Sequence, residues 1–95
     1  EKQSAVRLSS LSLSYNPSIP AEGFINMLDA IPADIDELGL VGCNLNDDVG
    51  QSLAKFLLKS TRLQMICVED NQFSASLKQK ISHSTRHLDD CTVIV

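Results

Sequence analysis

The most constraining feature of this sequence is a nine-residue pattern that occurs three times at nearly regular intervals. The pattern places apolar residues at its first, fourth and sixth positions and Asn or Cys at its ninth. "LSSLSLSYN" begins at Leu8, "IDELGLVGC" at Ile35 and "LQMICVEDN" at Leu63, so the starting positions are almost evenly spaced. An internal repeat with such an interval indicates one supersecondary unit that stacks on copies of itself. The spacing therefore constrains the architecture strongly and the function weakly.

Each repeat changes its hydrophobic period from its first part to its second. Within the pattern, inward and outward positions alternate at period two, which predicts strands centred near Leu11, Leu38 and Ile66. After each pattern, apolar residues recur at helical spacing, as Leu77 and Ile81 do in the third repeat. We therefore expect a helix after each of the three strands.

Local signals limit the predicted helices. Pro32 should end a helix in the segment 21–31, because the residue before a proline is disfavoured in helical geometry. Ser74 is placed as the N-cap of the third helix. Gly23 and Gly50 fall at the same distance from the starts of their repeats, at positions 8 and 35. Their matched positions predict a close approach of the helix and strand layers.

The repeated order of strand, loop and helix predicts parallel neighbouring strands joined by right-handed crossovers. The C-terminal segment "LDDCTVIV" offers Leu88, Cys91 and Val93 at the same apolar spacing. It predicts a fourth strand centred near Cys91 that caps the C-terminal end. Because Leu88 follows Leu63 sooner than Leu63 follows Ile35, we expect the last repeat to be shortened.

The chain is predicted to form a single domain over residues 1–95, because 95 residues support one small core. The predicted repeats cover about 8–34, 35–62 and 63–87, with a capping strand at 88–95 and an N-terminal edge, or the end of a missing repeat, at 1–7.

This pattern resembles the ribonuclease-inhibitor type of leucine-rich repeat (LRR), and the resemblance covers about residues 8–95. Its basis is the repeat length, the Asn or Cys that closes each strand pattern, and the full helix that follows. The resemblance implies an α/β fold, an LRR solenoid that forms a horseshoe segment, with a parallel sheet on the concave face and helices on the convex face. It also implies a structural ladder of side chains that bond the backbone of neighbouring turns, formed by Asn16, Cys43 and Asn71.

The resemblance further implies a non-catalytic module that binds, and inhibits or regulates, a partner protein through the concave face. Inhibitors of partner enzymes, fragments of sensor domains and bacterial effectors delivered into a host cell are the outcomes that we expect from this class. Three cysteines cannot all pair within one chain and match no zinc or redox motif, which favours reduced thiols and an intracellular, cytoplasmic location.

The strand residues between the apolar positions should form three columns on the concave face. These columns are predicted as Ser10, Glu37, Met65 and Asp90; Ser12, Gly39, Cys67 and Thr92; and Ser14, Val41, Glu69 and Ile94, with Tyr15 and Asp70 at the margin. The predicted protein-binding residues are Tyr15, Glu37, Val41, Met65, Cys67, Glu69, Asp70 and Asp90. The alternative is that the charged residues on this sheet serve only solubility.

Charge favours a basic protein as the partner. The formal net charge is −4, which disfavours nucleic acid or an anionic membrane as the main partner. Six of the eight Lys and Arg residues fall between positions 55 and 86, in or just after the predicted helices. The molecule should therefore be acidic on the sheet and mixed to basic on the helices.

Two other classes of function remain open. In the first, these repeats complete a larger LRR solenoid whose binding face lies elsewhere. In the second, the chain is an enzyme: His83 and His87, four apart and close to Asp89 and Asp90, could hold a metal on a helix, or Cys67 could act as a nucleophile. No further metal ligands and no base can be placed, so we expect no catalytic site, no metal and no cofactor.

Overall fold

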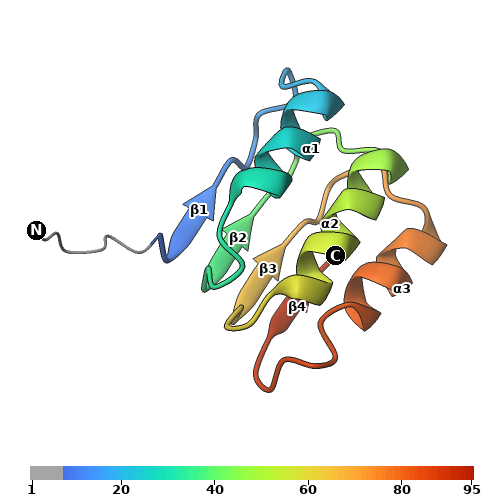
Figure 1. Ribbon diagram of the computed structural model, residues 1–95. Helices are drawn as coiled ribbons and strands as arrows, with labels where there is room; N and C mark the ends of the chain where they lie inside the picture. The colour runs from blue at the N-terminus through green and yellow to red at the C-terminus, as the bar shows by residue number, and fades with distance from the viewer. Residues whose placement is uncertain (1–7) are drawn as a thin grey trace, which may run out of the picture.

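The computed structural model describes residues 8–95, so the predicted edge at residues 1–7 lies outside the described range. Within it, strands and helices alternate without exception (Figure 1). The elements are β1 (Ser10–Ser12), α1 (Ala21–Ala30), β2 (Glu37–Gly39), α2 (Asp47–Lys59), β3 (Met65–Cys67), α3 (Ala75–His83) and β4 (Thr92–Ile94). The strands form one parallel sheet in the order β1-β2-β3-β4. The predicted α/β class, the parallel sheet and the intervening helices are confirmed.

The helices of the described range lie side by side over one face of the sheet (Figure 1). The other face carries no helix from residues 8–95, and we call it the open sheet face. In the second and third repeats, the apolar residues at the first, fourth and sixth positions form the core, and Leu11 and Leu13 of the first repeat pack against it. Leu38 and Ile66, at the centres of β2 and β3, are 2% and 0% exposed. None of the helices in this part of the chain is long and apolar enough to cross a membrane.

The helix boundaries follow from local chemistry. Helix α1 ends at Ala30, and Ile31 is already extended with ψ of 148°, because Pro32 follows it. At the start of α2, the side chain of Asn46 accepts a hydrogen bond from the backbone N–H of Val49 at 3.1 Å. Helix α3 is capped in the same way by Ser74, as the sequence predicts.

The register of the last strand differs from the prediction. Strands β1, β2 and β3 are centred on the predicted residues, but β4 is centred on Val93 and not on Cys91, and Val93 lies opposite Ile66. The interval from Ile66 to Val93 therefore equals the interval from Leu11 to Leu38, and the last repeat is not shortened. Cys91 and Val93 are on the same side of an extended chain, so the alternation of apolar residues could not exclude this slip.

The two helical glycines do not mark matched contacts between helices and strands, and that prediction is wrong. A Cβ atom on Gly50 would lie 2.9 Å from Cδ1 of Leu77 in α3 and 3.1 Å from Cδ1 of Phe73. The close approach at Gly50 is therefore between α2 and α3 with the segment just before it. Gly23 is the third residue of α1, whereas Gly50 is the fourth residue of α2, and a Cβ on Gly23 would meet mainly Ile19 at 3.2 Å.

Candidate functional site

The open sheet face is a grid of side chains set by the strand register. Its first row is Ser10, Glu37, Met65 and Thr92, and its second row is Ser12, Gly39, Cys67 and Ile94. A third row continues beyond the strands with Ser14, Val41 and Glu69, where Ser14 Oγ accepts a hydrogen bond from the N–H of Val41 at 3.0 Å. Every predicted binding residue except Asp90 belongs to this grid or, as Tyr15 and Asp70 do, to its margin. The pairing of the strands brings them together.

Three members of the predicted columns, Asp90, Thr92 and Ile94, are each displaced by one row because of the register of β4. Thr92, and not Asp90, lies beside Met65, and Ile94 lies beside Cys67. Asp90 instead precedes β4 and lines a separate depression near His87. Ile94 is 40% exposed, so it adds an apolar side chain to the middle row of the open sheet face.

A shallow depression lies in the middle of the grid because Gly39 has no side chain. A Cβ atom there would lie 3.3 Å from the Oγ atoms of both Ser12 and Ser14. The depression has a volume of about 150 Å³, and Met65 and Cys67 line its other side. Met65 is 39% exposed, and its flexible thioether side chain can adapt to a bound group. The depression can therefore receive one apolar side chain.

Acidic side chains surround Cys67 on this face. Burial raises the pKa of the Cys67 thiol, and the negative charges of Glu69 and Glu37 raise it further. The thiol is thus kept protonated at neutral pH, whereas a nucleophilic cysteine needs a lowered pKa. The arrangement is suited to binding through charge and apolar contact.

One carboxylate oxygen of Glu69 is buried without a hydrogen-bond donor among residues 8–95. This atom, Oε1, is out of contact with water, and the described part of the chain offers it no donor. An unsatisfied polar atom at a partly buried position costs stability. Because the chain itself covers this atom, the rest of the carboxylate is the part of Glu69 that can meet a partner.

The C-terminal margin of the grid is formed by residues with left-handed backbone geometry. Tyr15, Gly42 and Asp70 have φ values of 64°, 64° and 60° at equivalent positions of successive repeats. Glycine favours this geometry and aspartate tolerates it, so Tyr15 is the residue whose type does not indicate it. The ring of Tyr15 packs over Gly42, whose Cβ would lie 3.0 Å from Tyr15 Cδ1, and Tyr15 is still 74% exposed. A broad aromatic surface is therefore held in a defined place at the margin.

Asn71 connects the backbones of the second and third repeats. Its Nδ2 donates to the carbonyl oxygens of Leu40 and Val68 at 2.8 and 2.9 Å. Its Oδ1 accepts from the N–H groups of Cys43 and Leu45 at 2.9 and 3.0 Å. One side chain thus satisfies backbone groups in two neighbouring turns.

The equivalent residues of the earlier repeats make fewer connections. The Sγ of Cys43 donates to the carbonyl oxygen of Leu13 at 3.1 Å, across to the first repeat. Asn16 donates to the same carbonyl at 2.6 Å, but its bonds to described residues stay within its own turn, and it is exposed. These contacts serve the backbone and take no part in the open sheet face.

The two histidines do not share a helix face. Helix α3 ends at His83, and His87 lies in the following turns, where its Nε2 is 2.8 Å from the carbonyl oxygen of Ser60. The Nδ1 atom of His83 instead lies 3.4 Å from Nη1 of Arg86. Within residues 8–95, no group of three or more His, Cys, Asp or Glu side chains is arranged to hold a metal ion.

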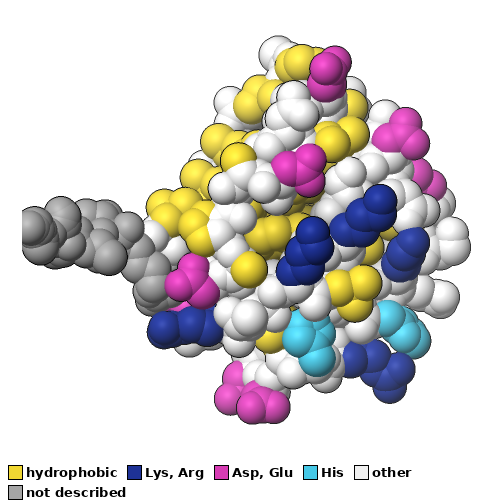
Figure 2. All heavy atoms as spheres, viewed as in Figure 1, with side chains coloured by type: hydrophobic (Ala, Val, Ile, Leu, Met, Phe, Trp, Pro, Cys, Tyr) yellow, Lys and Arg dark blue, Asp and Glu magenta, His cyan; other side chains and the backbone are white. Residues whose placement is uncertain are grey.

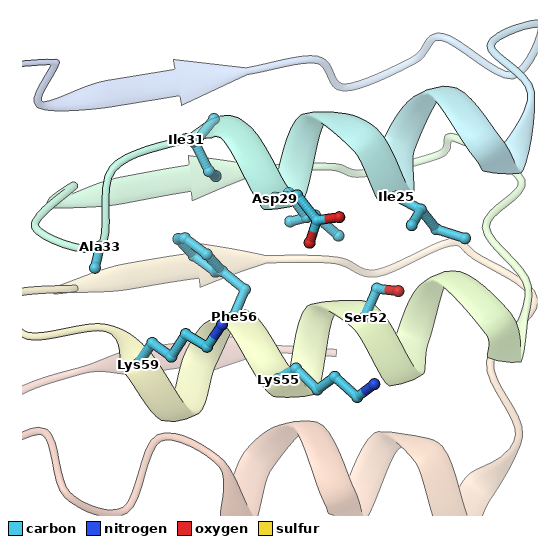
Figure 3. Close-up of a pocket in the computed structure, with 9 residues that line it drawn as sticks. Ile25, Asp29, Ile31, Ala33, Ser52, Lys55, Phe56 and Lys59 are labelled. Carbon is cyan, nitrogen blue, oxygen red and sulfur yellow. The ribbon is translucent and has the colours of Figure 1, made fainter.

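A larger groove, of about 300 Å³, lies on the helix side between α1 and α2 (Figure 3). Ile25 and Asp29 line it from α1, while Phe56 and the two lysines Lys55 and Lys59 line it from α2. Figure 2 shows this side of the molecule, with Lys and Arg side chains gathered over α2 and α3 and acidic side chains also present. The groove has charges of both signs, so it does not favour a partner of either charge.

Comparison with known proteins gives a structural likeness without a family assignment. The sequence matches no protein-family model, and no curated protein matches it. Among solved structures, a Caenorhabditis elegans tropomodulin C-terminal domain aligns with 92% of this chain at a TM-score of 0.83 and 17% sequence identity. That domain has an LRR-type fold, so the likeness supports an LRR-type fold for this chain. The aligned part covers 53% of that domain, and this chain therefore spans about half of its length.

Proposed function

We propose that this chain is a non-catalytic module that binds another protein through its open sheet face. The observation that carries the proposal is the grid itself, in which exposed Met65 and Ile94 and a depression over Gly39 lie among the carboxylates of Glu37 and Glu69. Apolar groups left open on a sheet are typical of a surface that a partner covers. Methionine and tyrosine are enriched at the centres of such interfaces.

The charge distribution favours a basic partner. None of the strands in residues 8–95 contains Lys or Arg, while Glu37, Glu69 and Asp70 lie on or beside the open sheet face. Complementary charge mainly accelerates association and is weakened by salt, whereas apolar contacts slow dissociation. The same charges disfavour nucleic acid and anionic membranes as partners.

A partner is first identified by cross-linking. Its binding is then measured to variants of this chain that each carry a pair of substitutions. Glu69→Lys with Asp70→Lys should slow association, and Tyr15→Ala with Met65→Ala should speed dissociation. Lys55→Ala with Lys59→Ala changes the helix groove and serves as the control. Binding that depends on the lysine pair and is unaffected by both other pairs would place the interface on the helix side and contradict the proposal.

We also propose that the repeats form a segment of a horseshoe-shaped solenoid of the ribonuclease-inhibitor type. Parallel strands paired in register at the nearly evenly spaced positions 11, 38, 66 and 93, with a helix between successive strands, support this narrower class. An intracellular location is proposed from the reduced state expected of the three cysteines. The bacterial-effector role rests on the resemblance in the sequence, and no described residue adds to it.

A second function, completion of a larger solenoid, is favoured by the β1 end of the sheet. Leu8 is 40% exposed, whereas Ile35 and Leu63, at the same position of later repeats, are 0% and 2% exposed. A further strand and helix packed on β1 would cover Leu8 and its neighbours. A mass measurement of the natural gene product tests this: a product of about 95 residues would contradict the larger solenoid.

A further inference from the structure

The rows of the open sheet face have the same spacing as the side chains of an extended peptide. Along β2 and its extension, Glu37, Gly39 and Val41 point to this face at every second residue. A strand rises about 3.3 Å per residue, so adjacent rows lie about 7 Å apart. Glu37 in the first row and Glu69 in the third are therefore separated by about 13 Å along the strands. The depression over Gly39 is lined by residues of the first and second rows, so it lies between the two glutamates along the strands and closer to Glu37, which lines it.

We propose that the open sheet face binds an extended segment of a partner protein with the pattern basic, any, aliphatic, any, basic. The basic side chains, Lys or Arg, contact Glu37 and Glu69, and the aliphatic side chain between them occupies the depression over Gly39. This inference rests on the proposed function, since it specifies the segment that the same face recognises. Side chains i, i+2 and i+4 of an extended chain point to one side at the spacing of the three rows.

The chemistry of the face selects this segment over the alternatives. An acidic segment would be repelled by Glu37 and Glu69, whose charges already raise the pKa of Cys67 between them. A wholly apolar segment would cover the carboxylates without pairing them, which is costly. A cationic side chain beside Glu69 pairs with the negative charge of its carboxylate, and the same holds at Glu37. The aliphatic side chain gains contact with Met65 and Cys67 at the depression.

The first test uses synthetic peptides and isotope-labelled protein. The matched peptide is Ac-Gly-Arg-Ser-Leu-Ser-Arg-Gly-NH₂, and the control, Ac-Gly-Arg-Leu-Ser-Ser-Arg-Gly-NH₂, has the same composition with the leucine moved to the opposite face. We expect the matched peptide to bind about tenfold more tightly, which corresponds to about 1.4 kcal/mol. Its titration should shift the backbone amide signals of Gly39, Met65 and Cys67. Replacement of both arginines by citrulline should abolish most of the binding.

The second test changes the protein. Gly39→Val fills the depression, and Cys67→Met narrows it from the other side without changing the glycine. Each should remove the preference for the matched peptide over the control peptide while thermal unfolding shows a folded protein. Glu37→Gln with Glu69→Gln should weaken the binding of both peptides. Glu22→Gln with Asp29→Asn, which removes the same charge from the exposed surface of α1, should leave both affinities unchanged.

The outcomes separate this inference from the proposed function. Equal affinity for the two peptides, or a preference that survives in both Gly39→Val and Cys67→Met, overturns the basic–aliphatic–basic pattern. The proposed function still stands in that case if the cross-linked partner is sensitive to the Tyr15→Ala and Met65→Ala pair. Peptide-induced shifts confined to the groove between α1 and α2 would contradict both.

Discussion

The first and second repeats share one sequence pattern but differ in burial. Leu8 is 40% exposed, and Leu11 and Leu13 are half-buried. The corresponding residues of the second repeat, Ile35, Leu38 and Leu40, are at most 2% exposed. The second repeat has a strand and a helix on both sides, whereas the described residues cover the first repeat on one side only.

This difference shows that the repeated sequence pattern sets the orientation of the side chains, while the neighbouring repeats set how much their burial stabilises the fold. The pattern fixes which side chains of a strand face the helices, and this holds at both positions. The free energy gained from burial depends on how many neighbouring repeats cover the same side chains. Equivalent substitutions in the two repeats should therefore have unequal effects.

The largest contrast should come from truncation of the core leucines. Leu38→Ala should reduce the free energy of unfolding by roughly 2–5 kcal/mol, because it leaves a cavity between two covered layers. Ile66→Ala should have an effect of the same size. Leu8→Ala should cost no more than about 1 kcal/mol, since its side chain already contacts water. Urea denaturation of the three variants measures the difference, and equal losses at Leu8 and Leu38 would contradict the account of burial.

The next contrast concerns the ladder residues. Asn71→Ala removes four hydrogen bonds, between 2.8 and 3.0 Å long, that join the Asn71 side chain to backbone groups. These partly buried backbone groups are then left unpaired. We expect a loss of about 2–3 kcal/mol, within the range for unsatisfied buried polar groups. Asn16→Ala removes bonds within one exposed turn and should cost less than about 1 kcal/mol. Denaturation of both variants tests this, and a larger loss for Asn16→Ala would mean that the first turn is more tightly held than its contacts indicate.

A smaller contrast is expected for the helical glycines. Gly50→Ala places a methyl group 2.9 Å from Leu77, and this overpacking should outweigh the gain in helix propensity by about 1 kcal/mol. Gly23→Ala meets mainly the flexible side chain of Ile19 at 3.2 Å and should be neutral or stabilising. Melting temperatures of the two variants provide the measurement, with the wild type as reference. Stabilisation by Gly50→Ala would show that α2 and α3 can separate at little cost.

The sequence predicted the repeats, the first three strands and the helix ends because each has a strong local signal. The repeated pattern places Leu11, Leu38 and Ile66, and Pro32 and Ser74 mark helix ends whatever the rest of the chain does. The position of β4 had no such signal. Cys91 and Val93 face the same side, so period-two alternation allows either one to lie opposite Ile66.

The open sheet face could be predicted as a surface, but two of its features could not. The depression follows from the absence of a side chain at Gly39 and from the neighbours that β1 and β3 supply, which only the pairing of strands defines. The left-handed backbone of Tyr15 is imposed by the repeat and not by its residue type. The position of Tyr15 over Gly42 therefore depends on tertiary structure.

The same comparison applies across the sheet, between Cys67 in the interior strand β3 and Cys91 beside the edge strand β4. Burial raises the pKa of both thiols, but the negative charges of Glu69 and Glu37 act on Cys67 alone. Removal of these charges in Glu37→Gln with Glu69→Gln should lower the pKa of Cys67, so that its alkylation by iodoacetamide begins at a lower pH. The shift should be partial, since burial is the larger cause and remains.

Cys91 in the same molecule is the internal control, and mass spectrometry of the alkylated peptides follows the two thiols separately. A shift of equal size at Cys91 would mean that the carboxylates act through the overall charge of the molecule, and the acidic surroundings assigned to the middle row would then be wrong.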